Sequence, residues 1–192
     1  FQENYNDASC KFILIDFENK NFEIFSSGHR NPQGLVVTKE NIIISTEHGS
    51  RGGDEINKIE FKKHYGWPIS SYGEEYVDSF KNEENFTYLK SHSKYGFQEP
   101  IYSFVPSIGI SQIIELPNSF HKRWQDNFLV SSLIDGSIYR IKFNDDYTSI
   151  LTMEKIEFQK RIRDINYLKK TKSILVAFEN EKGTLGIISA KK

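Results

Sequence analysis

The chain has 192 residues, of which 38% are hydrophobic and 27% are charged, enough for one globular domain with a packed core. Its net charge of −1 argues against nucleic acid or an anionic membrane as the main partner, and no apolar run approaches the roughly 20 residues of a membrane-spanning helix. A lone cysteine, Cys10, excludes a disulfide within the chain. Because Phe1–Asn4 matches neither an initiator methionine nor a signal peptide, we expect an internal start.

Short runs of alternating or β-branched residues follow one another along the whole chain, and each predicts a strand. The predicted strands are Lys11–Phe17, Phe22–Phe25, Gln33–Thr38, Asn41–Thr46, Glu55–Phe61, Pro100–Val105, Gln112–Leu116, Asn127–Ser132, Ser137–Phe143, Ile150–Phe158, Ile162–Leu168, Ser173–Phe178 and Thr184–Ser189. No helix longer than a turn or two is expected. Strands at spacings of about 8–12 residues indicate an all-β sandwich, barrel or propeller.

Groups of four strands separated by longer loops favour the propeller, and this chain would then hold about three blades. Three blades do not close a ring, so the chain is either part of a larger ring or has another architecture. Between Pro68 and Glu99 the strand pattern stops, and Ser, Tyr, Glu, Asn and Lys predominate. We expect this segment to be either a variable surface insertion or a loop across the mouth of a pocket.

The turn after Gly28 places Arg30 beside Asn31. A guanidinium and an amide next to each other can hold an anionic or carbonyl-rich ligand by forked hydrogen bonds. The alternative is an arginine that holds neighbouring backbone carbonyls.

A second turn, from Glu47 to Glu55, contains three carboxylates and three glycines within nine residues. Carboxylate and exposed carbonyl oxygens are the ligands that calcium prefers, although the spacing is not that of an EF-hand. A solvated acidic turn is the alternative. The five histidines, His29, His48, His64, His92 and His121, show no metal-ligand spacing.

Arg161 and Arg163 form a third group. Residues two apart in a strand share one face, so both guanidiniums point the same way while Ile162 points to the other side. Two cations on one face require anions opposite them, from the protein or from a ligand, unless the face is simply solvated.

Five motifs occur in a fixed order: GHRNPQG, TEHGSRGGDEIN, HYGWPISSYG, PSIGIS and RIRDI. Together they resemble the second half of the soluble PQQ-dependent sugar dehydrogenases, the glucose/sorbosone dehydrogenase family, from about Lys11 to Ile188. The resemblance implies a six-bladed β-propeller with PQQ at one end of the central channel. Residues 1–192 would be a single partial propeller, roughly the last three blades, without the N-terminal half.

By the same resemblance, Arg30 matches the arginine beside the reactive quinone carbonyls, and Asn31 matches the neighbouring PQQ contact. Arg161 and Arg163 match the pair that neutralises the cofactor carboxylates. The implied metal ligands are the backbone carbonyls of Gly49 and Ser50 for a calcium ion that bridges to PQQ, with Glu55 and the Tyr65 backbone at a second, structural calcium. The family's catalytic histidine lies in the half that is absent here, and Ile134 stands where the family usually has a PQQ-contacting lysine.

The resemblance implies an oxidoreductase that oxidises the C1 hydroxyl of aldose sugars, uses PQQ and Ca²⁺, and passes electrons to an acceptor in the periplasm or outside the cell. The alternative is a cofactor-free propeller that binds carbohydrate or protein, because propellers serve many functions. We expect the isolated chain to be inactive, since half a ring leaves open strand edges and a divided channel.

Overall fold

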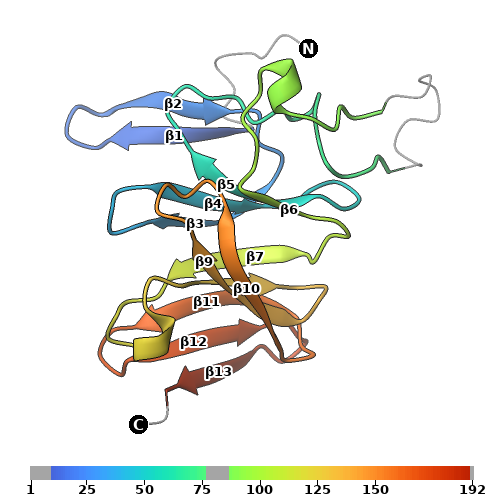
Figure 1. Cartoon of the computed structure of the whole chain (residues 1–192). Helices are drawn as coiled ribbons and strands as arrows, with labels where there is room; N and C mark the ends of the chain where they lie inside the picture. The colour runs from blue at the N-terminus through green and yellow to red at the C-terminus, as the bar shows by residue number, and fades with distance from the viewer. Residues whose placement is uncertain (1–9, 77–86, 191–192) are drawn as a thin grey trace.

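The computed structural model describes residues 10–76 and 87–190, which form thirteen strands and two short 3₁₀ helices (Figure 1). The predicted start at Phe1–Asn4, and residues 77–86 of the segment between Pro68 and Glu99, lie outside the described residues. The strands are β1 (Lys11–Asp16), β2 (Asn21–Ser27), β3 (Pro32–Val37), β4 (Ile43–Glu47), β5 (Asp54–Ile59), β6 (Tyr102–Phe104), β7 (Ile110–Glu115), β8 (Phe128–Ser132), β9 (Ser137–Phe143), β10 (Ile150–Glu157), β11 (Ile162–Leu168), β12 (Ser173–Phe178) and β13 (Thr184–Ser189).

These strands form four antiparallel sheets in sequence order, as in consecutive blades of a propeller. Two sheets have four strands each, β3–β6 and β7–β10. They are flanked by the hairpin β1–β2 and by the three-stranded sheet β11–β13. The all-β prediction is confirmed, and the described residues contain only the 3₁₀ helices Ser93–Tyr95 and Lys122–Trp124. No helix in this part of the chain is long and apolar enough to cross a membrane.

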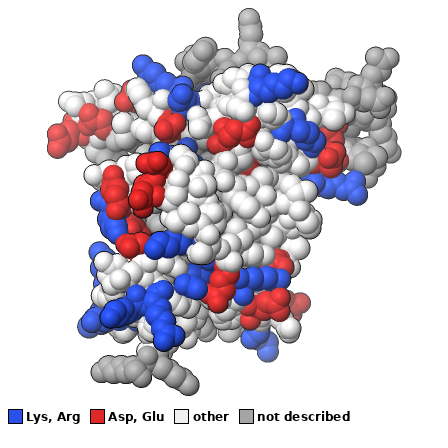
Figure 2. All heavy atoms as spheres, in the orientation of Figure 1, with Lys and Arg blue, Asp and Glu red and all other residues white. Residues whose placement is uncertain are grey.

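The core lies between the sheets and comprises two clusters, one on each face of β7–β10. Along β8, Phe128 and Val130 pack into the first cluster, against the sheet β3–β6, whereas Leu129 packs into the second, against the sheet β11–β13. Successive side chains of a strand point to opposite faces, so the run 128–130 supplies apolar side chains to both clusters. On the face drawn in Figure 2, acidic and basic side chains are interspersed around a broad uncharged area, so that face carries no field of a single sign.

The first strands of three successive sheets, β3, β7 and β11, lie next to one another, with β7 in the middle. A Cβ on Gly34 would lie 2.7 Å from the backbone nitrogen of Ile113, so only glycine permits this approach of β3 to β7. Polar contacts continue across the sheets: the Thr46 hydroxyl donates to the Ser111 carbonyl, and the Ser111 hydroxyl donates to the Ile162 carbonyl at 2.7 Å. These contacts, the polar seam Thr46–Ser111–Ile162, link the sheets β3–β6, β7–β10 and β11–β13.

Each of these three strands has a register irregularity near its start. The irregularities fall between Pro32 and Gly34, between Ile110 and Ile113, and between Ile162 and Asp164. Bulges bend a strand and redirect its side chains, and they are frequent beside functional sites. Arg30 and Asn31 precede β3, and Arg161 precedes β11, so the candidate residues gather where these strands begin.

Candidate functional site

A pocket of about 800 Å³ lies at this end of the molecule. It unites the first two candidate turns with the loop before β7 and the turn after β8. Its lining consists of Arg30, Asn31, His48, Gly49, Ser50, Arg51, Gly52, Tyr76, Val105, Pro106, Ser107 and Ile134. The structure therefore brings together four of the predicted site residues, Arg30, Asn31, Gly49 and Ser50. Arg161, Arg163, Glu55 and Tyr65 are not among the residues that line this pocket.

Arg30 is held at both ends. Its backbone N–H donates to the Glu47 carboxylate, and its Nη1 donates to the His48 carbonyl at 3.2 Å. The guanidinium lies over the Trp67 ring, 5.2 Å from its centre. Arg30 thus holds a neighbouring carbonyl, as the structural alternative predicted, but its Nε is buried without a hydrogen-bond partner among the described residues. Because an unpaired buried donor is costly, this N–H marks a place for an acceptor from a ligand.

The turn between β4 and β5 is tied down by Asp54, which is fully buried. One Asp54 oxygen accepts from the Gly49 backbone N–H at 3.1 Å, and the other accepts from the Ile110 N–H at 2.9 Å. The same carboxylate therefore fixes the second candidate turn against the start of β7. In the sequence Asp54 stands out only as one acid among three, because its partner Ile110 is 56 residues away.

Part of the segment after Pro68 packs directly on this turn. Arg51 and Glu74 exchange backbone hydrogen bonds, and the Tyr76 hydroxyl donates to the Ser50 carbonyl at 2.9 Å. Tyr76 also lines the pocket. The described part of this segment thus reaches the pocket rather than standing away from the fold.

The Gly49 and Ser50 carbonyls are hard oxygen donors of the kind that calcium takes, and a carbonyl has a second lone pair beyond the one that Tyr76 uses. The donor chemistry at this turn therefore fits the implied calcium.

Arg161 and Arg163 share one face, as predicted, while Ile162 is fully buried. Both guanidiniums pair with Glu179, the residue after β12. The Arg161 Nη2 lies 2.9 Å from the Glu179 Oε1, and the Arg163 Nη2 pairs with the Oε2. The two arginines lower the pKa of the Glu179 carboxyl by hydrogen bonding. The anion opposite the two cations is thus supplied by the protein itself, and Glu179 was not singled out from the sequence.

Arg163 is nevertheless close enough to the pocket to influence His48. Burial lowers the pKa of His48, Asp54 opposes this shift, and the positive charges of Arg30 and Arg163 add to it. Arg30, before β3, and Arg163, in β11, therefore both act on the same histidine, although they come from different sheets.

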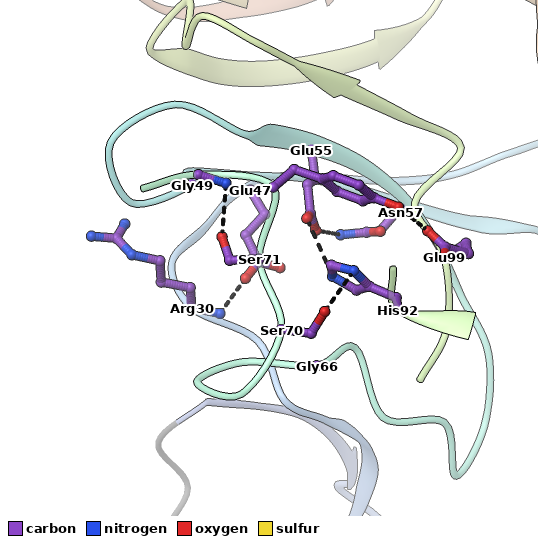
Figure 3. Close-up of polar contacts among 12 residues, drawn as sticks. Arg30, Glu47, Gly49, Glu55, Asn57, Gly66, Ser70, Ser71, His92 and Glu99 are labelled. Carbon is purple, nitrogen blue, oxygen red and sulfur yellow. Dashed lines mark hydrogen bonds and ion pairs between the residues drawn. The ribbon is translucent and has the colours of Figure 1, made fainter. Parts of the chain in front are cut away.

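Glu55 lies deeper, beside the pocket turn (Figure 3). Its Oε2 accepts from the Asn57 amide at 3.1 Å, and its Oε1 is 3.5 Å from the His92 Nε2. Burial raises the pKa of Glu55 to about 8, and the nearby charge of Glu47 adds to the effect. The buried Oδ1 of Asn57 has no partner among the described residues. In this structure the Glu55 carboxyl oxygens face the Asn57 amide and His92, and its role as a calcium ligand stays a prediction.

Tyr65, the other predicted ligand at this site, stacks its ring on His29 at 4.5 Å and is buried. The predicted role of its backbone stays a prediction.

Ile134 lines the pocket directly, with 69% of its surface exposed, beside Val105 at 68%. These two exposed aliphatic side chains, the apolar wall of the pocket, belong to a lining that is otherwise mostly polar. The position at which the resemblance implies a PQQ-contacting lysine therefore lines this pocket, and in this chain it carries an aliphatic side chain.

Known proteins resemble this chain in sequence and in fold. The family model described as Glucose / Sorbosone dehydrogenase matches residues 13–187. The aldose sugar dehydrogenase YliI of Escherichia coli is 31% identical over 144 residues, which cover 74% of this chain and 38% of that protein. The quinoprotein glucose dehydrogenase B of Acinetobacter calcoaceticus is 37% identical over 65 residues, which cover 34% of this chain and 12% of that protein.

Among solved structures, a glucose dehydrogenase superposes with a TM-score of 0.75 at 26% identity, covering 92% of this chain and 50% of that one. The chain therefore spans half or less of the length of these relatives. A match over nearly the whole chain, to a family whose members share this all-β fold, makes the assignment plain. The chain belongs to the glucose/sorbosone dehydrogenase family and comprises part of its propeller.

Proposed function

We propose that the complete protein is a PQQ-dependent oxidoreductase that oxidises the C1 hydroxyl of aldose sugars, and that this chain supplies one side of its cofactor site. The observation that carries the proposal is Arg30, whose buried Nε has no acceptor among the described residues, in a pocket shared with Asn31. An electron acceptor and a small sugar are the partners that this reaction requires. Family membership also supports a periplasmic or extracellular location as part of the proposal.

PQQ, when bound, supplies the quinone that accepts a hydride from the sugar. In the proposal, Arg30 would donate hydrogen bonds to the quinone oxygens, and Asn31 would contact the cofactor beside it. The Gly49 and Ser50 carbonyls would hold the calcium ion. Arg161 and Arg163, which pair with Glu179 in this structure, would neutralise the cofactor carboxylates. The histidine that takes the hydroxyl proton belongs to the other half of the ring.

The incomplete outer sheets support the view that residues 1–192 are one part of a ring. The sheet β11–β13 has three strands, one fewer than the complete sheets, and β13 is at its edge. Leu185 and Ile187 of β13 are 67% and 69% exposed. Exposed apolar side chains on an edge strand form a surface that a further strand or a neighbouring blade would cover.

The isolated chain is expected to be inactive. Half of the channel wall and the proton-accepting histidine are absent, so a sugar can neither be enclosed nor deprotonated. The measurement is reduction of an artificial electron-accepting dye by purified residues 1–192 with PQQ, calcium and an aldose. Sugar-dependent reduction above the rate of PQQ alone would contradict this expectation.

A cofactor-free binding module is the second candidate, and the apolar wall formed by Val105 and Ile134 favours it. The deciding measurement is calorimetric titration of PQQ, with calcium, into the protein extended to the complete propeller. We expect binding that Ile134→Lys strengthens about tenfold, because a charge-assisted hydrogen bond to an anion stabilises by roughly 1.5–3 kcal/mol.

Leu151→Lys is the matched control, since Leu151 is a similarly exposed aliphatic residue on the outer strand β10. It adds the same charge away from the pocket and should leave the affinity nearly unchanged. If neither the well-folded wild type nor Ile134→Lys binds PQQ, the dehydrogenase proposal fails and the binding module becomes the better account.

A further inference from the structure

The Glu47 carboxylate, at the end of β4, is the meeting point of three hydrogen bonds. Figure 3 shows the one from Arg30. Its Oε1 accepts from the backbone N–H of Arg30 and from that of Asn31 at 3.3 Å. Its Oε2 is 3.0 Å from the Nδ1 of His29. The Glu47 residue is only 4% exposed, so these protein groups, rather than water, satisfy its charge.

The contacts extend to a hydroxyl, since the Nε2 of His29 lies 2.9 Å from the Oγ of Ser26. A serine, histidine and acid in such a row also occur in hydrolases, where the hydroxyl is the nucleophile. That role does not apply here, because Ser26 is 1% exposed and His29 is 0% exposed. No substrate can reach the Ser26 hydroxyl. Ser26 and His29 instead hold the Glu47 carboxylate in place through the contact between His29 and Glu47.

Two consecutive amides bound to one carboxylate fix the backbone at Arg30 and Asn31 relative to β4. Hydrogen bonds to an ionised acceptor are roughly twice as strong as neutral ones. The residue after Glu47 holds the other end of the same side chain, since the His48 carbonyl accepts from Arg30 Nη1. With both ends of Arg30 fixed by consecutive residues, its Nε, unpaired within the described part of the chain, has a defined position.

We propose that Glu47 is the positioning residue of the cofactor site, which sets the place of the Arg30 and Asn31 side chains without touching the ligand. The inference rests on the proposed function for its ligand, PQQ. It adds to that function a buried carboxylate, Glu47, which sets the geometry of the turn. Glu47 was not among the residues implied by the resemblance.

The test is a double-mutant cycle read by PQQ titration in the complete propeller. Glu47→Gln keeps the shape but removes the charge, and should weaken PQQ binding about tenfold. In an Arg30→Ala, Asn31→Ala background the same change should cost less than about twofold, because the groups it positions are gone. Equal losses in both backgrounds would overturn the proposal, as they would indicate a general effect on folding.

Glu115→Gln is the matched control, because Glu115 also ends a strand and accepts a backbone N–H, that of Lys39 at 3.0 Å. It should leave PQQ affinity unchanged. If Glu47→Gln folds poorly by near-ultraviolet circular dichroism, Glu47→Asp replaces it. That variant retains the charge but withdraws the oxygens by one methylene, and should weaken PQQ binding in the same direction.

A second measurement separates this inference from the proposed function. Amide hydrogen exchange of the 192-residue chain, followed by NMR, should become about tenfold faster at Arg30 and Asn31 in Glu47→Gln, and remain unchanged at Lys39. If the wild type binds no PQQ, the proposed function fails, and with it the ligand named here. If amide exchange at Arg30 and Asn31 is unchanged in Glu47→Gln, Glu47 does not hold the turn, whether or not the protein binds PQQ.

Discussion

Arg30→Ala is expected to lower kcat/KM for aldose oxidation by about 10²–10³ in the complete, PQQ-loaded protein. The substitution removes a pocket guanidinium whose buried Nε has no acceptor in the described part of the chain and is open to one from a ligand. Preorganised donors aimed at developing negative charge are among the largest contributions to catalysis, because they are already ordered before the reaction begins. Steady-state kinetics with saturating PQQ and calcium would measure the effect.

Arg140→Ala is a matched control for this result. Like Arg30, Arg140 lies with its guanidinium 5.2 Å from the centre of a tryptophan ring, that of Trp124, but it belongs to β9, away from the pocket. Its loss should leave kcat/KM within about twofold. A similar loss of activity in both variants, or retained activity in Arg30→Ala, would mean that the pocket is not where oxidation occurs.

Gly53→Ala is expected to lower the free energy of unfolding by about 3–5 kcal/mol. Gly53 has a positive φ of 69°, and an added Cβ would lie 2.3 Å from the backbone nitrogen of Gly73. Two rigid backbone segments meet at this point, so the clash cannot be relieved by a side-chain rotation. Urea unfolding followed by tryptophan fluorescence would report the change.

Gly183→Ala isolates the cost of the backbone angle alone. Gly183 has a comparable φ of 60°, but an added Cβ there would meet no described atom within 4 Å. It should cost only about 1 kcal/mol. If the two substitutions cost the same, the close approach of the two segments does not exist in solution. If Gly53→Ala does lower stability more, it should also break the hydrogen bond from Tyr76 to the Ser50 carbonyl. That hydrogen bond joins the same two segments as the approach of Gly53 to Gly73.

The strands could be predicted from the sequence because their signals are local. Alternation in Ser137–Phe143 and the apolar run Ser173–Phe178 appear as β9 and β12 with the predicted bounds. The shared face of Arg161 and Arg163 followed from the same two-residue period. Other boundaries moved by one or two residues, as at Pro32, a turn residue that joins β3.

The supporting contacts of the site could not be predicted, because their partners are far apart in sequence. Glu47 binds amides 16 and 17 residues earlier, and Asp54 binds one 56 residues later. A buried carboxylate and a solvated one look alike in a sequence, so a turn rich in acids suggested either a metal or water. Only the fold distinguishes acids that hold loops from acids that hold a cation.

The polar seam Thr46–Ser111–Ile162 has a mechanical consequence for this family member. Apolar faces in contact resist separation but tolerate slippage, because the hydrophobic effect has no direction. Hydrogen bonds between sheets do have a direction, and they lock neighbouring sheets against sliding along their strands. The loops that lead into β3, β7 and β11 are therefore held at fixed positions relative to one another.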